Sequence, residues 1–127
     1  MNLLLDTHTF IWWDINPANL SPRALSALRD PANTKWISVV SIWEMVIKNQ
    51  RGKLTLHQPL SQIVAQQQAN GLQVLVVSLA HVLAVEGLPP IHKDPFDRLL
   101  VAQTNVEAAE LVTVDPIFAH YPVKVLW

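Results

Sequence analysis

Short apolar runs alternate with helix-forming segments along the whole chain, and this alternation constrains the fold more than any other feature. Apolar runs that predict strands lie at residues 3–5, 35–40, 72–79, 111–114 and 123–126. Short continuous apolar runs are typical of buried parallel strands, and helices between them supply the crossover connections. We therefore predict an α/β fold, specifically a three-layer α/β/α sandwich with a mostly parallel central sheet.

Capping residues mark the ends of the helices between these strands. Ser21 followed by Pro22 predicts a helix start, because serine caps an N-terminus and proline fits the first turn. Gly52 predicts the end of a helix, since glycine is favoured just past a C-terminus. No linker or internal repeat interrupts the order, so residues 1–127 are expected to form one domain. The remaining helices are predicted over residues 7–13, 41–52, 59–70, 80–89 and 94–109.

The composition excludes several classes of protein. Hydrophobic residues make up 50% and charged residues 15%, which is incompatible with a disordered chain. The chain has no cysteine, so disulfides, thiolate metal sites and a cysteine nucleophile are excluded. The N-terminus has no basic leader and no apolar stretch is long enough to span a membrane. We therefore expect a cytoplasmic protein with no membrane contact, and the net charge of −1 offers no overall basic surface for nucleic acid.

Four acidic residues lie where apolar runs give way to helix starts: Asp6, Glu44, Asp97 and Asp115. In a parallel α/β fold these junctions share one edge of the sheet, which is where such folds place their ligand sites. Carboxylates that converge there repel one another unless a cation compensates. Hard oxygen ligands favour Mg²⁺ or Mn²⁺, and such ions commonly serve phosphodiester hydrolysis. The sequence thus predicts a metal-binding acidic cluster.

Each of these acids also has a structural explanation as a helix cap. Ser41 and Glu44 have the spacing of a capping box, in which each side chain bonds the backbone of the other residue. Asp94 precedes Pro95, with Asp97 at the third helical position, and Asp115 also precedes a proline. Only 10 residues of the chain are acidic, so four at one sheet edge favour a joint role. We interpret Asp94 as a cap only.

Four blocks of sequence resemble PIN-domain proteins and, more narrowly, the VapC-type toxins of bacterial toxin–antitoxin pairs. They follow the family's order and approximate spacing and together cover nearly the whole chain. By position, Asp6, Glu44, Asp97 and Asp115 match the four acids of the family, and none is missing. The blocks are LLLDTHTFIWW, SVVSIWEMVIKNQRGKL, HKDPFDRLLVAQ and LVTVDPIF.

The resemblance implies a metal-dependent endoribonuclease that acts as the toxin of a VapBC-type pair. The four acids would be both the catalytic residues and the ligands of Mg²⁺ or Mn²⁺, with one or two ions left open. The implied partners are the RNA substrate, a cognate VapB-like antitoxin that blocks the acidic groove, and a second copy of the chain, in a homodimer or a higher toxin–antitoxin assembly. Neither the RNA target nor the cleavage sequence follows from the resemblance.

Residues near the acids are candidates for supporting roles. Thr7 and Ser41 are candidates for orienting the site, Ser41 as the cap that aims Glu44. Arg98 is the first candidate for substrate contact among nearby cations, and Glu44 and Lys48 have the spacing of an ion pair. The other cations near this edge are Lys93, Arg51 and Lys53.

The histidines and tryptophans near these junctions are interpreted as structural. His8 and His92 lie close to the acids, but a histidine beside a turn more commonly packs or faces solvent than acts as a base. Trp36 and Trp43 are predicted to pack in the core, although exposed aromatic residues can stack on unpaired bases.

Of three alternative functions, two stay open and one is excluded. A PIN nuclease for RNA maturation or decay, or for structured DNA, would use the same acids without an antitoxin. A non-catalytic PIN-like module would bind protein or RNA, and the intact set of four acids argues against it. A phosphotransfer receiver domain needs an aspartate after the third strand, and Ser78 stands there instead.

Overall fold

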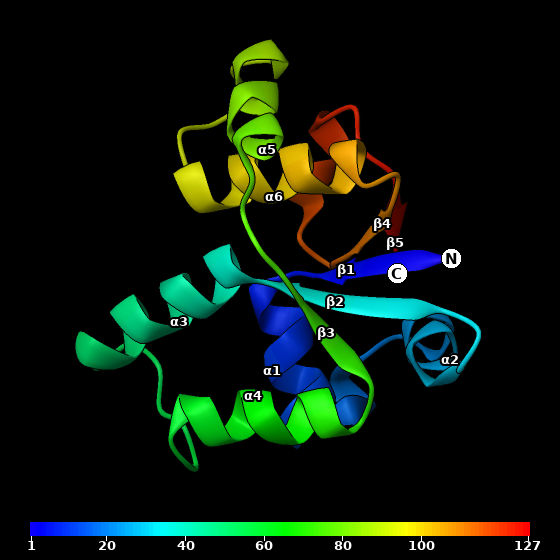
Figure 1. Ribbon diagram of the computed structural model, residues 1–127, viewed down its shortest axis with the longest axis vertical. Helices are drawn as coiled ribbons and strands as arrows, with labels where there is room; N and C mark the ends of the chain where they lie inside the picture. The colour runs from blue at the N-terminus through cyan, green and yellow to red at the C-terminus, as the bar shows by residue number, and fades with distance from the viewer.

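A computed structural model describes residues 1–127 and shows one sheet with helices on both faces (Figure 1). Its strands run in the order β3-β2-β1-β4-β5, and all four neighbouring pairs are parallel. The predicted α/β sandwich with a parallel sheet is confirmed. Because the chain adds β2 and β3 on one side of β1 and then β4 and β5 on the other, the strand order reverses at β1. The strands are β1 (Asn2–Leu5), β2 (Thr34–Ser38), β3 (Leu72–Leu75), β4 (Glu110–Val112) and β5 (Val125–Leu126).

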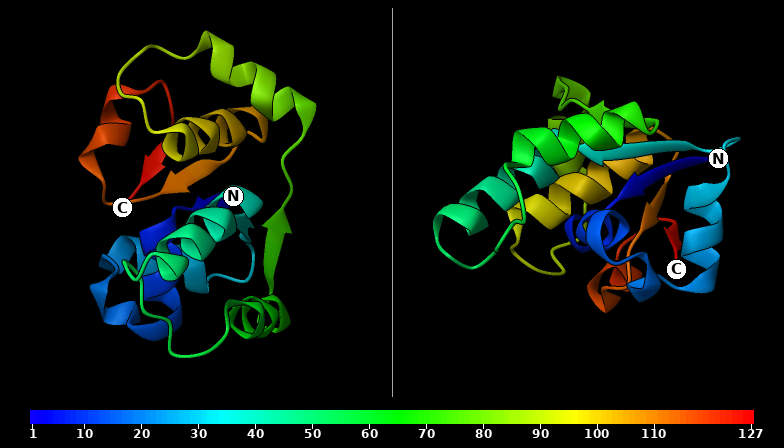
Figure 2. Two further views of the ribbon diagram at one scale, coloured as in Figure 1. Left: turned by 90° about the vertical axis from the view of Figure 1, so that its left-hand side faces the viewer. Right: turned by 90° about the horizontal axis from the view of Figure 1, so that it is seen from below.

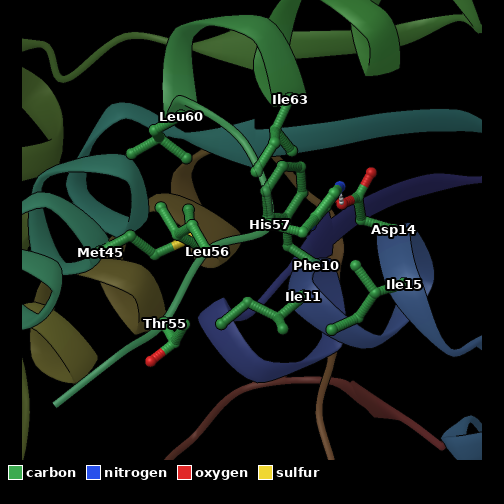
Figure 3. Close-up of a pocket in the computed structure, with 10 residues that line it drawn as sticks. All are labelled: Phe10, Ile11, Asp14, Ile15, Met45, Thr55, Leu56, His57, Leu60 and Ile63. Carbon is green, nitrogen blue, oxygen red and sulfur yellow. Dashed lines mark ion pairs between the residues drawn. The ribbon is translucent and has the colours of Figure 1, made fainter.

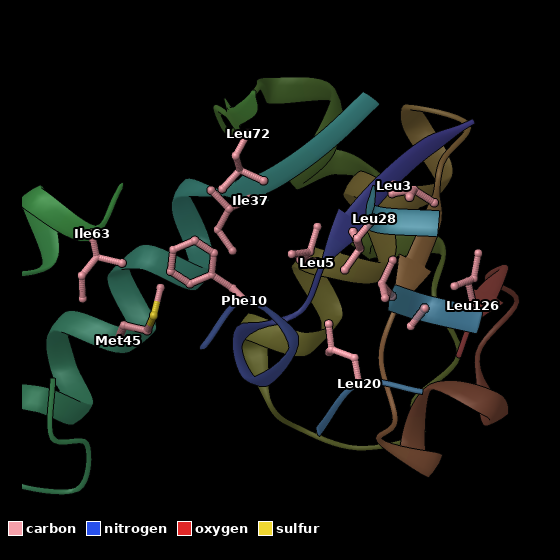
Figure 4. Packing of buried hydrophobic residues seen from close by; sticks show 12 residues of the cluster. Leu3, Leu5, Phe10, Leu20, Leu28, Ile37, Met45, Ile63, Leu72 and Leu126 are labelled. Atoms are coloured by element: carbon pink, nitrogen blue, oxygen red, sulfur yellow. The ribbon is translucent and has the colours of Figure 1, made fainter. Parts of the chain in front are cut away.

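Two apolar clusters, one on each face of the sheet, form the core. Leu3 and Leu5 of β1 belong to the first cluster and Leu4 to the second, as the alternation of side chains along a strand requires. The first cluster packs α1 (Thr7–Ile15), α2 (Pro22–Arg29) and α4 (Leu60–Ala69) against the sheet (Figure 4).

The second face is covered by α6 (Pro95–Val106), and α5 (Leu79–Ala84) packs against α6 (Figure 2). Helix α3 (Val39–Gln50) continues β2 beyond the sheet edge and contributes Val40 to the second cluster and Met45 to the first. Short 3-10 helices occupy Pro17–Asn19, Val85–Gly87 and Pro116–His120. No helix is long and apolar enough to cross a membrane.

Several helix boundaries follow the predicted capping signals. The Ser21 side chain accepts a hydrogen bond from the backbone N–H of Ala24, and Asp94 accepts from the N–H groups of Phe96 and Asp97. Gly52 ends α3 in the left-handed conformation, with φ of +69°, which costs glycine no steric strain. These ends are therefore determined by local sequence.

The start of α3 differs from the prediction. Strand β2 ends at Ser38 and the helix begins at Val39, so Ser41 lies inside the helix and the predicted capping box of Ser41 and Glu44 is wrong. The Ser38 hydroxyl accepts from the N–H of Val40 at 3.1 Å and donates to Oε1 of Gln103 in α6 at 2.5 Å. The two valines favoured a longer strand because β-branched residues are common in strands, but the contact with α6 supplies a cap at Ser38, three residues before Ser41.

Two other elements end earlier than predicted. Strand β3 ends at Leu75, and Ser78 begins α5 through a capping box with His81. Helix α6 ends at Val106, and Ala108 then adopts φ of +51° before β4. Residues 76–78 form neither strand nor helix, and a turn at residues 107–108 separates α6 from β4.

Candidate active site

All four predicted acids line one pocket at the carboxyl edge of the sheet. Asp6 follows β1, Glu44 lies in α3, Asp97 lies in the first turn of α6 and Asp115 follows β4. The pocket has a volume of about 120 Å³ and lies where the strand order reverses, the usual position of ligand sites in open α/β sheets. Its lining is Asp6, Thr7, His8, Glu44, Lys48, Asp94, Asp97, Asp115 and Phe118.

Asp6 is the most buried of the four acids and is held by hydrogen bonds. Its Oδ1 accepts from the backbone N–H of Thr9 at 2.8 Å, and its Oδ2 accepts a short bond from the Thr113 hydroxyl. Burial raises the pKa of the Asp6 carboxyl above its ordinary value of 3.8, although the bonds from Thr113 and Thr9 act in the opposite direction. Folding therefore places the Asp6 carboxyl at a position where its ionised form is costly.

Glu44 is buried and each of its carboxylate oxygens has a partner. The Thr7 hydroxyl donates to Oε1 at 2.6 Å, and the Lys48 ammonium lies 2.9 Å from Oε2. The ion pair predicted from the spacing of Glu44 and Lys48 is confirmed. Ser41 does not bond Glu44, and its buried hydroxyl has no hydrogen-bond partner. Thr7, the other predicted orienting residue, is therefore the residue that contacts Glu44.

Asp97 is the end of a chain of polar contacts that begins at Arg98. The Arg98 guanidinium donates to the Tyr121 hydroxyl at 3.2 Å, which lies 2.6 Å from Nδ1 of His92, and Nε2 of His92 lies 3.0 Å from Oδ2 of Asp97. An ionised carboxylate only accepts, so Nε2 of His92 carries a proton, and in the neutral imidazole Nδ1 then accepts from the Tyr121 hydroxyl. Burial raises the pKa of Asp97, and the nearby charges of Asp94 and Glu44 raise it further, while the bond from His92 opposes both.

Asp94 and Asp115 are caps that also line the pocket. Oδ1 of Asp94 accepts from two backbone N–H groups of α6, as predicted for a cap. Oδ1 of Asp115 accepts from the N–H of Ile117 at 3.0 Å and begins the 3-10 helix Pro116–His120. Capping and a place in the pocket are thus compatible, and Asp94 is a fifth carboxylate that the sequence interpretation had set aside.

The donor set fits a divalent cation. The pocket offers only oxygen and imidazole donors, with carboxylates in excess, which suits Mg²⁺ or Mn²⁺. The like charges that raise the pKa of Asp97 would be offset by a cation. As the side chains lie, no three of them could hold an ion together. Mg²⁺ usually keeps several waters, so one or two of these carboxylates would suffice to hold it.

Comparison with known proteins identifies the family of this chain. Residues 3–124 match the PIN domain. The chain belongs to the PIN-domain family. No curated protein sequence matches this PIN domain.

Solved structures share the fold of this PIN domain. A chain of VapBC2 from Rickettsia felis, bound to a DNA fragment from its promoter, aligns with a TM-score of 0.69 at 18% identity, over 98% of this chain and 96% of that one. A chain of DNA-bound VapBC from Salmonella typhimurium aligns with a TM-score of 0.63 at 17% identity, over the same shares. VapBC-1 from nontypeable Haemophilus influenzae gives 0.60 at 18% identity, over 91% and 87%. At these identities the likeness establishes the fold.

Three residues of the PIN domain lie differently from expectation. Arg98, the first candidate for substrate contact, points away from the acidic pocket and donates to the carbonyl of Pro89 at 2.8 Å as well as to Tyr121. Trp43, predicted to pack in the core, is 59% exposed, so that prediction is wrong. His92, interpreted as a surface or packing residue, contacts Asp97 directly.

The partners of Asp6 and of His92 were missed by sequence reasoning. Thr9 and Thr113 bond Asp6, and Tyr121 bonds His92. Thr113 is separated from Asp6 by 107 positions, so only the pairing of β1 with β4 brings them together. The only local signal for Thr113 is its place near the end of a predicted strand, just before Asp115.

A second hollow on the molecule contains none of the four acids. It lies under the segment between α3 and α4 and is mostly apolar (Figure 3). At its rim Asp14 lies 3.6 Å from Nε2 of His57 and accepts a hydrogen bond from Gln67 at 2.9 Å. Its apolar lining separates it chemically from the acidic pocket. The lining is Phe10, Ile11, Asp14, Ile15, Met45, Thr55, Leu56, His57, Leu60 and Ile63.

Proposed function

We propose that this PIN domain is a metal-dependent endoribonuclease and the toxin of a VapBC-type toxin–antitoxin pair. The observation that carries the proposal is the convergence of Asp6, Glu44, Asp97 and Asp115 from four separate segments into one pocket. The pKa values of the Asp6 and Asp97 carboxyls are raised, and perturbed pKa values cluster at functional sites. Membership of the PIN-domain family and the fold shared with VapBC complexes support the same proposal.

The four acids would hold one or two Mg²⁺ or Mn²⁺ ions. When bound, such an ion activates water and offsets the charge that builds on the scissile phosphate. The surrounding residues of the chain set the geometry of the ligands. Thr9 and Thr113 fix the Asp6 carboxylate, Thr7 and Lys48 fix Glu44, and His92 fixes Asp97. Partners of this kind commonly affect metal affinity or activity by about 10–100-fold.

The proposed protein partners are a VapB-like antitoxin and a second copy of the chain. The antitoxin is proposed because the similar structures are VapBC complexes. The homodimer is supported by an apolar face at α5, whose members are 50–73% exposed and carry no charge: Val76, Leu79, Val82 and Leu83. Exposed apolar faces of this kind mark protein interfaces. A cytoplasmic location is proposed with this role.

Cleavage of cellular RNA by the purified chain tests the proposal. We expect fragments in the presence of Mg²⁺ or Mn²⁺ and none in EDTA. Growth arrest on expression, relieved by a small reading frame next to this gene, would distinguish a toxin from a PIN nuclease of RNA maturation or decay. RNA binding without cleavage under every metal condition would instead favour the non-catalytic alternative.

A further inference from the structure

A basic groove adjoins the acidic pocket along α3. It has a volume of about 210 Å³ and shares Glu44, Lys48 and Asp94 with the pocket. The two hollows are therefore adjacent, and a strand that extends from the acids on this side would pass along the groove. Its lining is Glu44, Ile47, Lys48, Arg51, Lys53, Asp94 and Phe96.

Two basic side chains of the groove form no ion pair within the protein. Lys48 is paired with Glu44, but Arg51 and Lys53 are exposed and form no ion pair. Ile47, Lys48 and Arg51 lie one helical turn from Glu44 or from each other, so they share the face of α3 that carries Glu44. Three of the nine Lys and Arg residues of a chain with net charge −1 thus line one groove beside its acids.

An exposed tryptophan packs against a partly buried phenylalanine that lines the same groove. Phe96 lines it, and the Trp43 ring packs edge-on against Phe96 with centroids 5.2 Å apart and an interplanar angle of 78°. The Trp43 side chain remains 59% exposed, although burying an indole is strongly favourable. Its free surface is available to a flat partner, and unpaired bases stack on such surfaces.

We propose that this groove binds the strand of a single-stranded RNA next to the bond that is cut, with Arg51 and Lys53 on phosphates and Trp43 stacked on a base. The proposal rests on the proposed function, because the acids define where the cut bond lies. Cations alone would suit any polyanion, whereas cations together with an exposed indole suit a strand with unpaired bases. The groove also explains how a chain without an overall basic surface attracts RNA to a pocket of carboxylates.

Equilibrium binding of a fluorescent single-stranded oligouridylate in EDTA tests the phosphate contacts. The parent is the Asp97→Asn chain, which reduces repulsion from the pocket, and it is compared with the same chain carrying R51A and K53A. We expect weaker binding and a slope of log Kd against log salt concentration that is shallower by about 1.4, because each single-strand phosphate contact contributes about 0.7. The matched control carries R23A and R29A, which remove the same charge from exposed positions on α2, far from α3 (Figure 1).

The base contact is tested with Trp43→Ala and Trp43→Phe. We expect Trp43→Ala to weaken oligouridylate binding about tenfold, as the loss of one stacked base does, and Trp43→Phe to restore most of it. Binding of inorganic polyphosphate should not change with either variant, because it has no base. Equal loss for both probes would contradict the stacking contact.

Cleavage by the metal-loaded chain separates this proposal from the proposed function. R51A with K53A should raise KM and leave kcat nearly unchanged, as the loss of uniform binding does. If R51A with K53A leaves both oligouridylate binding by the Asp97→Asn parent and RNA cleavage by the otherwise unmodified chain unchanged, or if the parent binds no oligouridylate, the groove is not the RNA site. If the unmodified chain cleaves no RNA in Mg²⁺ or Mn²⁺, the proposed function fails instead, whatever the groove binds.

Discussion

At the scale of single residues, the acidic pocket contains carboxyl groups whose ionised form is disfavoured in the folded protein. The pKa of Asp6 is raised by burial, and that of Asp97 by burial and by the charges of Asp94 and Glu44. A carboxyl whose pKa is raised on folding favours the folded state most at low pH. That contribution is fully present below the ordinary value of 3.8 and is lost as the pH rises through the raised value. At neutral pH these carboxylates therefore reduce stability unless a cation is present.

Asp97→Asn is therefore expected to raise the melting temperature by a few degrees at neutral pH in EDTA. The asparagine keeps an oxygen that accepts from His92 and removes the disfavoured charge. The advantage should shrink as the pH is lowered toward 4. Added Mn²⁺ should stabilise the unmodified chain more than the variant, because a ligand of the folded state raises its stability by mass action. A lower melting temperature for the variant in EDTA would contradict this account of the charge.

Tyr121→Phe is expected to loosen Asp97 without disturbing the core. The ring of Tyr121 is buried and phenylalanine fills the same space, but the donor to His92 is lost. We expect a decrease of about tenfold in metal affinity or in kcat, the range found when a partner of a ligand is removed. Isothermal titration with Mn²⁺ and steady-state cleavage measure the two. Unchanged values in both would mean that the chain from Tyr121 to Asp97 has no positioning role.

The acids and the partners of Glu44, Thr7 and Lys48, could be predicted from the sequence, but the partners of Asp6 and Asp97 could not. Asp6, Asp97 and Asp115 stand at junctions that local capping and apolar patterns identify. His92 and Tyr121 meet across 29 positions through the packing of η3 (Pro116–His120) beside α6, and no local pattern encodes that meeting.

At the scale of elements, the start of α3 decides where Glu44 points. The helix begins at Val39 because Ser38 caps it and is itself held by Gln103 of α6. Glu44 then lies in the second turn of α3, on the face that carries Lys48, instead of at the third helical position. Local propensity placed this start two residues later, since Ser41 fits a capping box equally well by spacing. The hydrogen bond between Ser38 and Gln103, which are distant in sequence, determines the start of the helix instead.

Substitution of the two serines tests this helix start. Ser38→Ala should lower the free energy of unfolding by about 2 kcal/mol, because it removes a helix cap and leaves buried Oε1 of Gln103 without a donor. Ser41→Ala should change it by less than about 0.5 kcal/mol, since the Ser41 hydroxyl makes no hydrogen bond. Urea unfolding of both variants measures the difference. The reverse ranking would restore Ser41 as the cap.

At the scale of the whole molecule, the strand order brings the site together. Asp6 follows the central strand β1, whose neighbours β2 and β4 lead directly to α3 and to Asp115, so distant segments share one edge. This part of the fold was predictable, because alternating strands and helices leave few parallel topologies. The exposure of Trp43 was not, since an apolar helix face does not reveal which of its residues meets another layer.

The apolar face of α5 predicts self-association. Leu79 is 73% exposed and lies beside Val82 and Leu83 on one face of the helix. Leu79→Lys places a charge in the proposed interface and should shift the chain from dimer to monomer in sedimentation velocity. Lys124→Glu, at an exposed position beside β5, is the control and should leave the dimer intact. A monomeric unmodified chain would contradict the proposed homodimer.

The most direct test of a metal-dependent ribonuclease is the rate of RNA cleavage by Asp6→Asn in Mg²⁺ or Mn²⁺. Asp6 is the most buried acid of the pocket and directly follows the central strand, so its charge is the hardest to explain by structure alone. We expect the rate to fall at least about a thousandfold, as loss of several kcal/mol of charge stabilisation requires. Glu86→Gln, at an exposed acid outside the pocket, should cleave at the unmodified rate. Full activity in a folded Asp6→Asn chain would contradict the account.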